Sequence, residues 1–179
     1  MDNVKICAVK ASAKIPDTDL ACVQRFCKQN GIRYKIFNRS HLVVYDRYTF
    51  CIFKKSPNSF NDQHVNITKI QNTNNIISAV EDLAWLIDTE PKNIFCSVDN
   101  ITATGNLEKN IDLEEFLHAN NDLKDFISYQ PERFPGLFIR SRNGKIIVFK
   151  SGKMVFVGCK KAHQIEDLNK YMLQKCALM

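Results

Sequence analysis

Two apolar strands joined by a tight turn decide the fold, and they occupy the stretch Lys145-Ile146-Ile147-Val148-Phe149-Lys150-Ser151-Gly152-Lys153-Met154-Val155-Phe156-Val157. Successive residues of a strand point to opposite faces of its sheet, yet both sets are apolar here. One set, expected beneath helices, is Ile146, Val148, Met154 and Phe156. The other, expected on the opposite face, is Ile147, Phe149, Val155 and Val157. An antiparallel sheet with helices on one side normally has a polar second face, so the stretch predicts either a second covering layer or an exposed binding surface.

The same order of elements occurs twice along the chain, as strand, helix, about four strands, helix. The first series is expected at Val4–Ile15, from Pro16-Asp17-Thr18-Asp19 through Gln29, then at Ile32–Phe37, His41–Asp46, Tyr48–Lys54, His64–Ile70 and Asn74–Ile87. The second is expected at Ile94–Leu107, Leu113–Phe126, Tyr129–Phe134, Leu137–Arg140, Lys145–Lys150, Lys153–Gly158 and Ala162–Gln174. We therefore predict an α+β fold of two repeats, residues 1–90 and 91–179, joined near Glu90-Pro91-Lys92.

Length and composition favour a globular protein. A chain of 179 residues suffices for one domain or for two half-domains that share a core. No apolar run approaches the roughly 20 residues of a membrane-spanning helix, and the first residues lack a signal-peptide core, so we expect an intracellular protein with no membrane partner. Two helices per half can cover one face of a sheet, and no further segment remains to cover the other.

Charge is segregated along the second half. From Arg133 to His163 there are eight Lys or Arg residues and no acid, whereas Asp99 to Glu132 carries eight acids and two lysines. A basic surface suits phosphates, although basic runs are often only solvated faces. An apolar strip flanked by Arg140, Arg142, Lys150, Lys153 and Lys160 matches the DNA minor groove, and pairing of two copies through the same face is an equal alternative at this point.

Signs of catalysis or of a cofactor are lacking. The seven cysteines are scattered singly, with no C-x-x-C pair and no histidine at zinc spacing, so we interpret them as reduced thiols. Asp112, Glu114 and Glu115 have no histidine or cysteine partner at a recognisable spacing, and no phosphate-binding glycine loop occurs. We expect a protein that is not an enzyme and that needs no cofactor or metal.

A longer motif surrounds the apolar stretch. Tyr129-Gln130-Pro131-Glu132-Arg133-Phe134-Pro135-Gly136-Leu137 is followed by Arg140, by the run Ile147–Val155 and by Gly158-Cys159-Lys160. In order and spacing this resembles the C-terminal repeat of the TATA-box-binding-protein family, from about Val98 to the last helix. The resemblance implies a saddle in which two pseudo-symmetric repeats form one curved antiparallel sheet, with helices on the convex side.

The resemblance also implies roles for single residues. Phe134 and Phe149 correspond to the phenylalanines that wedge between base steps, and Asn100 to the asparagine that bonds base edges. Glu132 lies where the family's loop contacts transcription factor IIB, and Gln130 replaces an acidic residue beside it. The expected apolar floor is Ile147, Val155 and Val157, and the expected phosphate contacts are Arg140, Ser151, Lys153 and Lys160. Thr102 stands where the family usually has valine, which adds a hydroxyl at the centre of the site.

The first half keeps the order of elements but loses the motif. We expect Phe53 to correspond to Phe149 and the position matching Phe134 to fall near His41 or Leu42, so one wedge is expected to be missing. The connection from Ser56 to Gln63 is longer than the turn at 150–153. Residues 64–68 alternate polar with apolar, which predicts a more polar concave surface in this half.

The resemblance, together with the apolar and basic face, implies a transcription initiation factor that binds and bends AT-rich promoter DNA through the minor groove. Its expected partners are a protein resembling transcription factor IIB and the RNA polymerase machinery, in the nucleus or, for a viral chain, at a cytoplasmic site of transcription. Abundant Asn, Lys and Ile suggest an AT-rich genome, with a virus as one source. The alternative is an interaction module of the same fold that has lost or altered DNA binding, and two copies could pair through the concave face without DNA.

Overall fold

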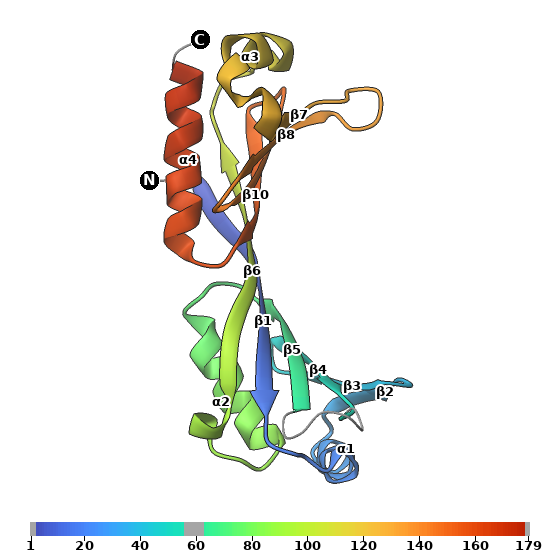
Figure 1. Ribbon diagram of the computed structural model, residues 1–179. Helices are drawn as coiled ribbons and strands as arrows, with labels where there is room; N and C mark the ends of the chain where they lie inside the picture. The colour runs from blue at the N-terminus through green and yellow to red at the C-terminus, as the bar shows by residue number, and fades with distance from the viewer. Residues whose placement is uncertain (1–2, 56–62, 178–179) are drawn as a thin grey trace. The chain divides into compact units, whose positions relative to one another are not determined.

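The computed structural model describes residues 3–55 and 63–177, which form two compact units. The first unit is Ala8–Asp99; the second runs from Asn100 onward and includes the start of the chain up to Cys7. Both contain antiparallel strands and helices (Figure 1), which confirms the α+β class. The connection expected to be long, Ser56 to Gln63, lies outside the described residues except for Gln63.

The first unit is a sheet in the order β2-β3-β4-β5-β1. Its strands are β1 (Val4–Ile15), β2 (Arg33–Ile36), β3 (Ser40–Tyr45), β4 (Tyr48–Phe53) and β5 (Gln63–Ile70), and its helices are α1 (Leu20–Gln29), α2 (Asn75–Leu86) and the short η1 (Pro91–Asn93). Asp19 begins α1 by accepting a hydrogen bond from the Ala21 amide at 2.8 Å, as an N-cap should.

The second unit is a sheet in the order β6-β10-β9-β8-β7. Its strands are β6 (Phe95–Asn106), β7 (Ile127–Ser128), β8 (Gly136–Ser141), β9 (Gly144–Phe149) and β10 (Lys153–Cys159), and its helices are α3 (Leu113–Ala119), η2 (Asn121–Phe126) and α4 (Ala162–Ala177). The first five residues of β6 are counted with the first unit.

Alternation along the strands puts one face of each sheet into a core. In the second unit α4 packs on β9 and β10 (Figure 1), and Ile146, Val148, Met154 and Phe156 are at most 1% exposed. In the first unit α2 packs on β5, and Phe50, Ile52, Val65 and Ile67 are fully buried. Each such side chain contributes about 1.5–3 kcal/mol by leaving water. The prediction of which hairpin residues face the helices is confirmed.

Two expected elements are wrong. The helix expected over Leu113–Phe126 is an α-helix only to Ala119, and a 3-10 helix follows it. The α-helix ends at Asn120, whose backbone leaves the helical region at φ -115 and ψ 47. Its amide and its buried side chain both donate to the Phe116 carbonyl, at 3.1 and 2.9 Å, and these two hydrogen bonds hold the helix end. The strand expected over Tyr129–Phe134 is a loop, and only Ile127–Ser128 pair with β8.

Candidate nucleic-acid interface

One face of the second unit's sheet bears a row of apolar side chains across three strands. Phe138 of β8 lies opposite Ile147 of β9, which lies opposite Val155 of β10, and Val155 lies opposite Thr104 of β6. Phe138, Ile147 and Val155 are all partly exposed, although their neighbours along each strand are buried. Val157 continues the apolar face toward Lys145. We call the outward side chains of β6, β10, β9 and β8 the exposed face; no described residue of this unit buries it.

Three phenylalanines meet at one end of the exposed face. The ring centroid of Phe134 lies 5.1 Å from that of Phe138 and 5.9 Å from that of Phe149. Gly136 makes room for them, since a Cβ there would lie 2.6 Å from the Phe134 ring and 2.8 Å from Ile147. Phe134 remains 37% exposed. The structure thus brings together the two phenylalanines that the sequence singled out.

The amide of Asn100 links two strands of the exposed face. Its Oδ1 accepts a hydrogen bond from the Gly158 amide at 2.6 Å, and its Nδ2 donates to Thr102 Oγ1 at 3.1 Å. The bond to Gly158 spans a bulge in β10, where the register with β6 shifts between Phe156 and Cys159. An amide nitrogen carries two hydrogens, so one donor of Asn100 stays available at a partly exposed position.

Cations border the exposed face. Arg140 pairs with Lys145 across β8 and β9, Lys153 begins β10, and Lys160 follows its end. All four side chains are exposed, and none of the ion pairs within residues 3–55 and 63–177 involves them. Unpaired cations beside an apolar strip form a surface of positive potential.

The turn between β9 and β10 holds Ser151 at one corner of the exposed face. Gly152 donates to the Phe149 carbonyl at 2.9 Å and has φ +77. A Cβ on Gly152 would lie 2.1 Å from the Lys109 carbonyl oxygen, so only glycine fits. Beside the turn, Thr104, Phe149, Lys153 and Val155 are among the residues that line a hollow of about 650 Å³.

Gln130 and Glu132 lie in the exposed loop that precedes β8. The Gln130 carbonyl accepts hydrogen bonds from the amides of Arg133 at 3.0 Å and Phe134 at 2.9 Å. These bonds turn the chain just before Phe134 and leave the Glu132 side chain in solvent, where another protein could reach it.

The outward face of the first unit is more polar, as predicted. Leu42, Cys51, Asn66 and Ser12 lie in one row across β3, β4, β5 and β1, where the second unit has Phe138, Ile147, Val155 and Thr104. Ser12 Oγ donates to Asp99 Oδ2 at 2.5 Å, and Lys10 Nζ lies 3.9 Å from the same oxygen.

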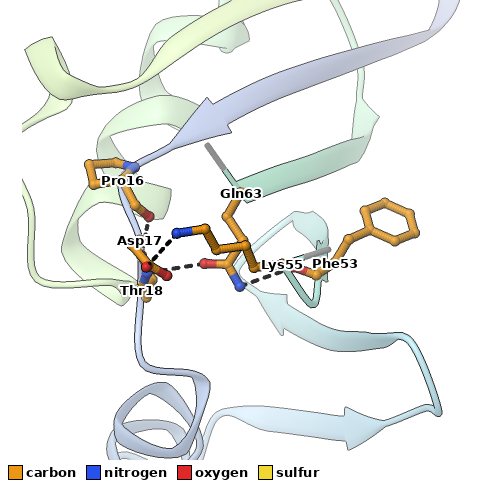
Figure 2. A network of polar contacts seen from close by, with 6 residues as sticks. All are labelled: Pro16, Asp17, Thr18, Phe53, Lys55 and Gln63. Atoms are coloured by element: carbon orange, nitrogen blue, oxygen red, sulfur yellow. Dashed lines mark hydrogen bonds and ion pairs between the residues drawn. The ribbon is translucent and has the colours of Figure 1, made fainter. Parts of the chain in front are cut away.

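A polar network anchors Phe53, the one site residue predicted in the first unit. Gln63 is 3% exposed; its Nε2 donates to the Phe53 carbonyl at 3.0 Å, and its Oε1 accepts from the Thr18 amide at 3.1 Å. Lys55 Nζ lies 2.7 Å from Asp17 Oδ2. Figure 2 shows the Phe53 ring pointing away from this network. The end of β4 is therefore fixed through its backbone, and the ring stays partly exposed.

Sequence reasoning misplaced the first unit's counterpart of Phe134. Ser40 lies opposite Phe53 as Gly136 lies opposite Phe149, so the register assigns Asn38 to that position. His41, one of the two residues suggested, is 7% exposed and corresponds to buried Leu137. Phe134 lies two residues before Gly136, and Asn38 lies two residues before Ser40. The suggestion was wrong because this count depends on strand register, which tertiary pairing sets.

Sequence reasoning missed two phenylalanines that the structure leaves at least partly exposed. Phe138 is on the exposed face, and alternation from Leu137 and Ile139, both buried, could have identified it. Phe37 is 51% exposed in the turn between β2 and β3, where its amide donates to the Ser40 carbonyl at 2.8 Å. The signal available in the sequence was a phenylalanine directly before Asn38-Arg39, in the connection between two expected strands.

Other kinds of site find little support in the described part of the chain. Among residues 3–55 and 63–177, no group of three or more His, Cys, Asp or Glu side chains is arranged to hold a metal ion. No helix in the same ranges combines the length and apolarity that a membrane crossing requires.

The chain is similar in sequence to TATA-box-binding proteins. Residues 96–177 match the family model "Transcription factor TFIID (or TATA-binding protein, TBP)". A TATA-box-binding protein of Tetrahymena thermophila is 34% identical over 121 residues, 66% of this chain and 45% of that protein. One of Methanobrevibacter smithii is 38% identical over 87 residues, 47% of this chain and 46% of that protein. The chain spans about half the length of these relatives.

The fold comparison covers the whole chain. The structure described as Methanococcus jannaschii TBP superposes with a TM-score of 0.74 over 99% of both chains, at 21% sequence identity. The family is described as a transcription factor and not as an enzyme, in agreement with the sequence-based expectation. Residues 96–177 belong to the TATA-box-binding-protein family, and the chain as a whole has the fold of that family.

Proposed function

We propose that the chain is a transcription initiation factor whose exposed face binds the minor groove of AT-rich promoter DNA and bends it. One observation carries the proposal: Ile147, Phe149, Val155 and Val157 stay partly exposed on the side opposite the helices. A large exposed apolar patch indicates a binding surface. The relatives' printed name, TATA-box-binding protein, favours DNA as the ligand.

Phe134 and Phe149 act as the wedge. Their rings touch at the end of the exposed face, and packing over Gly136 holds them in place. Opening a base step costs a few kcal/mol, a figure that belongs to minor-groove proteins of this family and not to this chain. Large rings that are already desolvated on one side can offset that cost.

Asn100 and Thr102 read the base edges. The minor groove presents the acceptors N3 of adenine and O2 of thymine, and the second amide hydrogen of Asn100 can donate to either. The Thr102 hydroxyl, which accepts from Asn100, can donate its own hydrogen to the groove. We expect a sequence preference that differs from a standard TATA element.

Arg140, Ser151, Lys153 and Lys160 contact phosphates along the rim. The three cations are exposed and free of ion pairs within the described residues, so binding DNA breaks no intramolecular pair. Each phosphate neutralised releases counterions, which makes the affinity fall as salt rises.

The bend is lopsided, with the sharper kink at the end gripped by the second unit. Phe53 is the corresponding ring of the first unit, but Ser40 and Asn38 stand where the second unit has Gly136 and Phe134. A bend-phasing assay tests this: two equal kinks would contradict the lopsided bend and give the second wedge to Phe37 and Phe53.

The loop at Gln130 and Glu132 contacts a protein resembling transcription factor IIB, which links the promoter to the RNA polymerase machinery. Exposure of Glu132 beside Phe134 supports this role. The protein then acts where transcription takes place, the nucleus of a cellular host or a cytoplasmic viral site.

Without DNA, two copies pair through the exposed face. Sedimentation at rising protein concentration tests this pairing.

Titration of an AT-rich duplex at two salt concentrations tests DNA binding itself. We expect saturable binding that weakens steeply as salt rises and a preference over a GC-rich duplex of equal length. Absence of saturable binding at low salt would instead favour the second function class, an interaction module of this fold that has lost DNA binding.

A further inference from the structure

A second surface lies on the helical side of the first unit. A groove of about 800 Å³ runs between α1 and the C-terminal end of α2. Its apolar part includes Phe26, Trp85 and Ile87, and its acidic part includes Asp17, Asp19 and Asp88. We call it the α1–α2 groove. None of these six side chains belongs to the exposed face assigned to DNA.

Trp85 gives the groove a fixed aromatic wall. Its ring stacks on Tyr45 at 5.1 Å between centroids and meets the edge of Phe26 at 4.7 Å. Trp85 is nevertheless 48% exposed. A large aromatic surface that is exposed and already held by neighbours loses little conformational freedom on binding, which is typical of residues that anchor a partner.

The charge of the α1–α2 groove is opposite to that of the chain. The net charge is +6, but Arg25 is the only Lys or Arg among the described residues that line the groove. No basic side chain lies in the last turn of α2, so the partial negative charge of that helix end is not offset from within the helix. Asp88 lies two residues beyond the end of α2, after the C-cap Ile87, at φ +52.

This combination selects a cationic and apolar ligand. Carboxylates repel nucleic acid and anionic lipid, whereas an aromatic face beside carboxylates attracts Lys and Arg. The volume of the groove lies within the range of about 300–1,000 Å³ that is typical of ligand-binding clefts.

We propose that the α1–α2 groove binds a segment of another protein that presents a bulky apolar side chain flanked by Lys or Arg. The apolar side chain packs on Trp85 and Phe26, and the cations face Asp19 and Asp88. Asp17 contributes less, because Lys55 already pairs with it (Figure 2). This partner would bind whether or not the exposed face takes DNA.

Fluorescence of Trp85 tests the proposal without DNA, because the chain contains one tryptophan. The probe is a short synthetic peptide with Leu and Phe flanked by Lys, and its control has each Lys replaced by Glu. We expect a saturable change in emission with the Lys peptide and none with the Glu peptide. Equal binding of both peptides, or no saturation with the Lys peptide, would overturn the proposal.

Paired charge-neutralising variants separate the groove from general electrostatics. Asp19→Asn with Asp88→Asn removes two groove charges, while asparagine still suits an N-cap and a positive φ. The matched control is Asp112→Asn with Glu108→Gln, which removes the N-cap charge of α3 and a charge at φ +57 in the second unit. We expect the groove variant to bind the Lys peptide about five- to thirtyfold more weakly and the control to bind it as the unaltered chain does. Equal weakening in both would refute the proposed site.

Discussion

The strands of the two units pair in the same register, but the side chains on their outward faces differ. In the second unit a row of the outward face is Phe138, Ile147, Val155 and Thr104, and in the first it is Leu42, Cys51, Asn66 and Ser12. The buried strand residues are apolar in both units except His41 and Gln63 of the first. Folding therefore constrains one face of each sheet, while the other face is free to diverge and records what each unit binds.

The residue that lies opposite Phe149 or Phe53 across the strand pair differs as well. Gly136 lets three phenylalanine rings converge, whereas Ser40 lies at the corresponding place in the first unit. No ring contact to Phe53 occurs among the described residues, in contrast to the contact between Phe149 and Phe134. An aromatic cluster is rigid, and rigidity is what a wedge requires.

The largest effect is expected from Phe149→Ala. Losing the ring should weaken binding of the AT-rich duplex by about 1–3 kcal/mol, the effect of stacking a base on an aromatic ring, or about fivefold to 150-fold. It should also reduce the bend measured by fluorescence energy transfer between duplex ends. The free energy of unfolding should fall by only about 1–2 kcal/mol, since the ring is partly exposed. The control, Phe53→Ala, should change the bend less. An unfolded Phe149→Ala variant with no DNA defect of its own would mean that the ring serves only packing.

Exchange of one row residue between the units should have a smaller effect. Val155→Asn puts the first unit's side chain into the second, and we expect about fivefold weaker binding of the AT-rich duplex, because an apolar contact is lost and a polar group loses water. Asn66→Val is the reciprocal change and should leave the affinity within about twofold, a span of some 0.4 kcal/mol. Isothermal titration of both variants measures this, and equal losses would show that the two faces contribute alike.

Lys153→Ala addresses the charged rim. We expect a lower affinity and a plot of log K against log salt that is flatter by about one unit, as for loss of one phosphate contact. The register-equivalent His64→Ala in the first unit is the control. An unchanged slope for Lys153→Ala would remove that lysine from the phosphate contacts.

The smallest effect concerns His41, which occupies the place of Leu137. Burial, and to a lesser extent the nearby Lys54 charge, lowers the pKa of His41 below its ordinary value of 6.5, and Tyr34 shares a hydrogen bond with its Nδ1. Because the unfolded chain takes up the proton first, the free energy of unfolding should decrease as pH falls below 6.5. His41→Leu should remove that component of the pH dependence. Urea unfolding at a series of pH values compares the two proteins, and parallel curves would contradict the assignment.

Much of the fold could be predicted from local patterns. Val4–Ile15 matches β1 residue for residue, and alternation separated the buried from the exposed residues of the hairpin at 145–157. The same reasoning failed at Asn120, where the backbone leaves the helical region and ends a helix that the apolar spacing extended to Phe126. Local periodicity does not report such a change of backbone conformation.

Part of the candidate site could likewise be predicted from the sequence, and part could not. Periodicity and the Lys150–Lys153 turn sufficed to put Phe149 and Val155 on one face, because a strand alternates with a period of two whatever surrounds it. Only the tertiary structure decided that Phe134 leans on Phe138 across Gly136, that Asn100 reaches Gly158, and that Trp85 and Asp88 share a groove with Asp19. Those relations depend on strand register and helix packing, which join residues far apart in the chain and leave no mark in any single segment of the sequence.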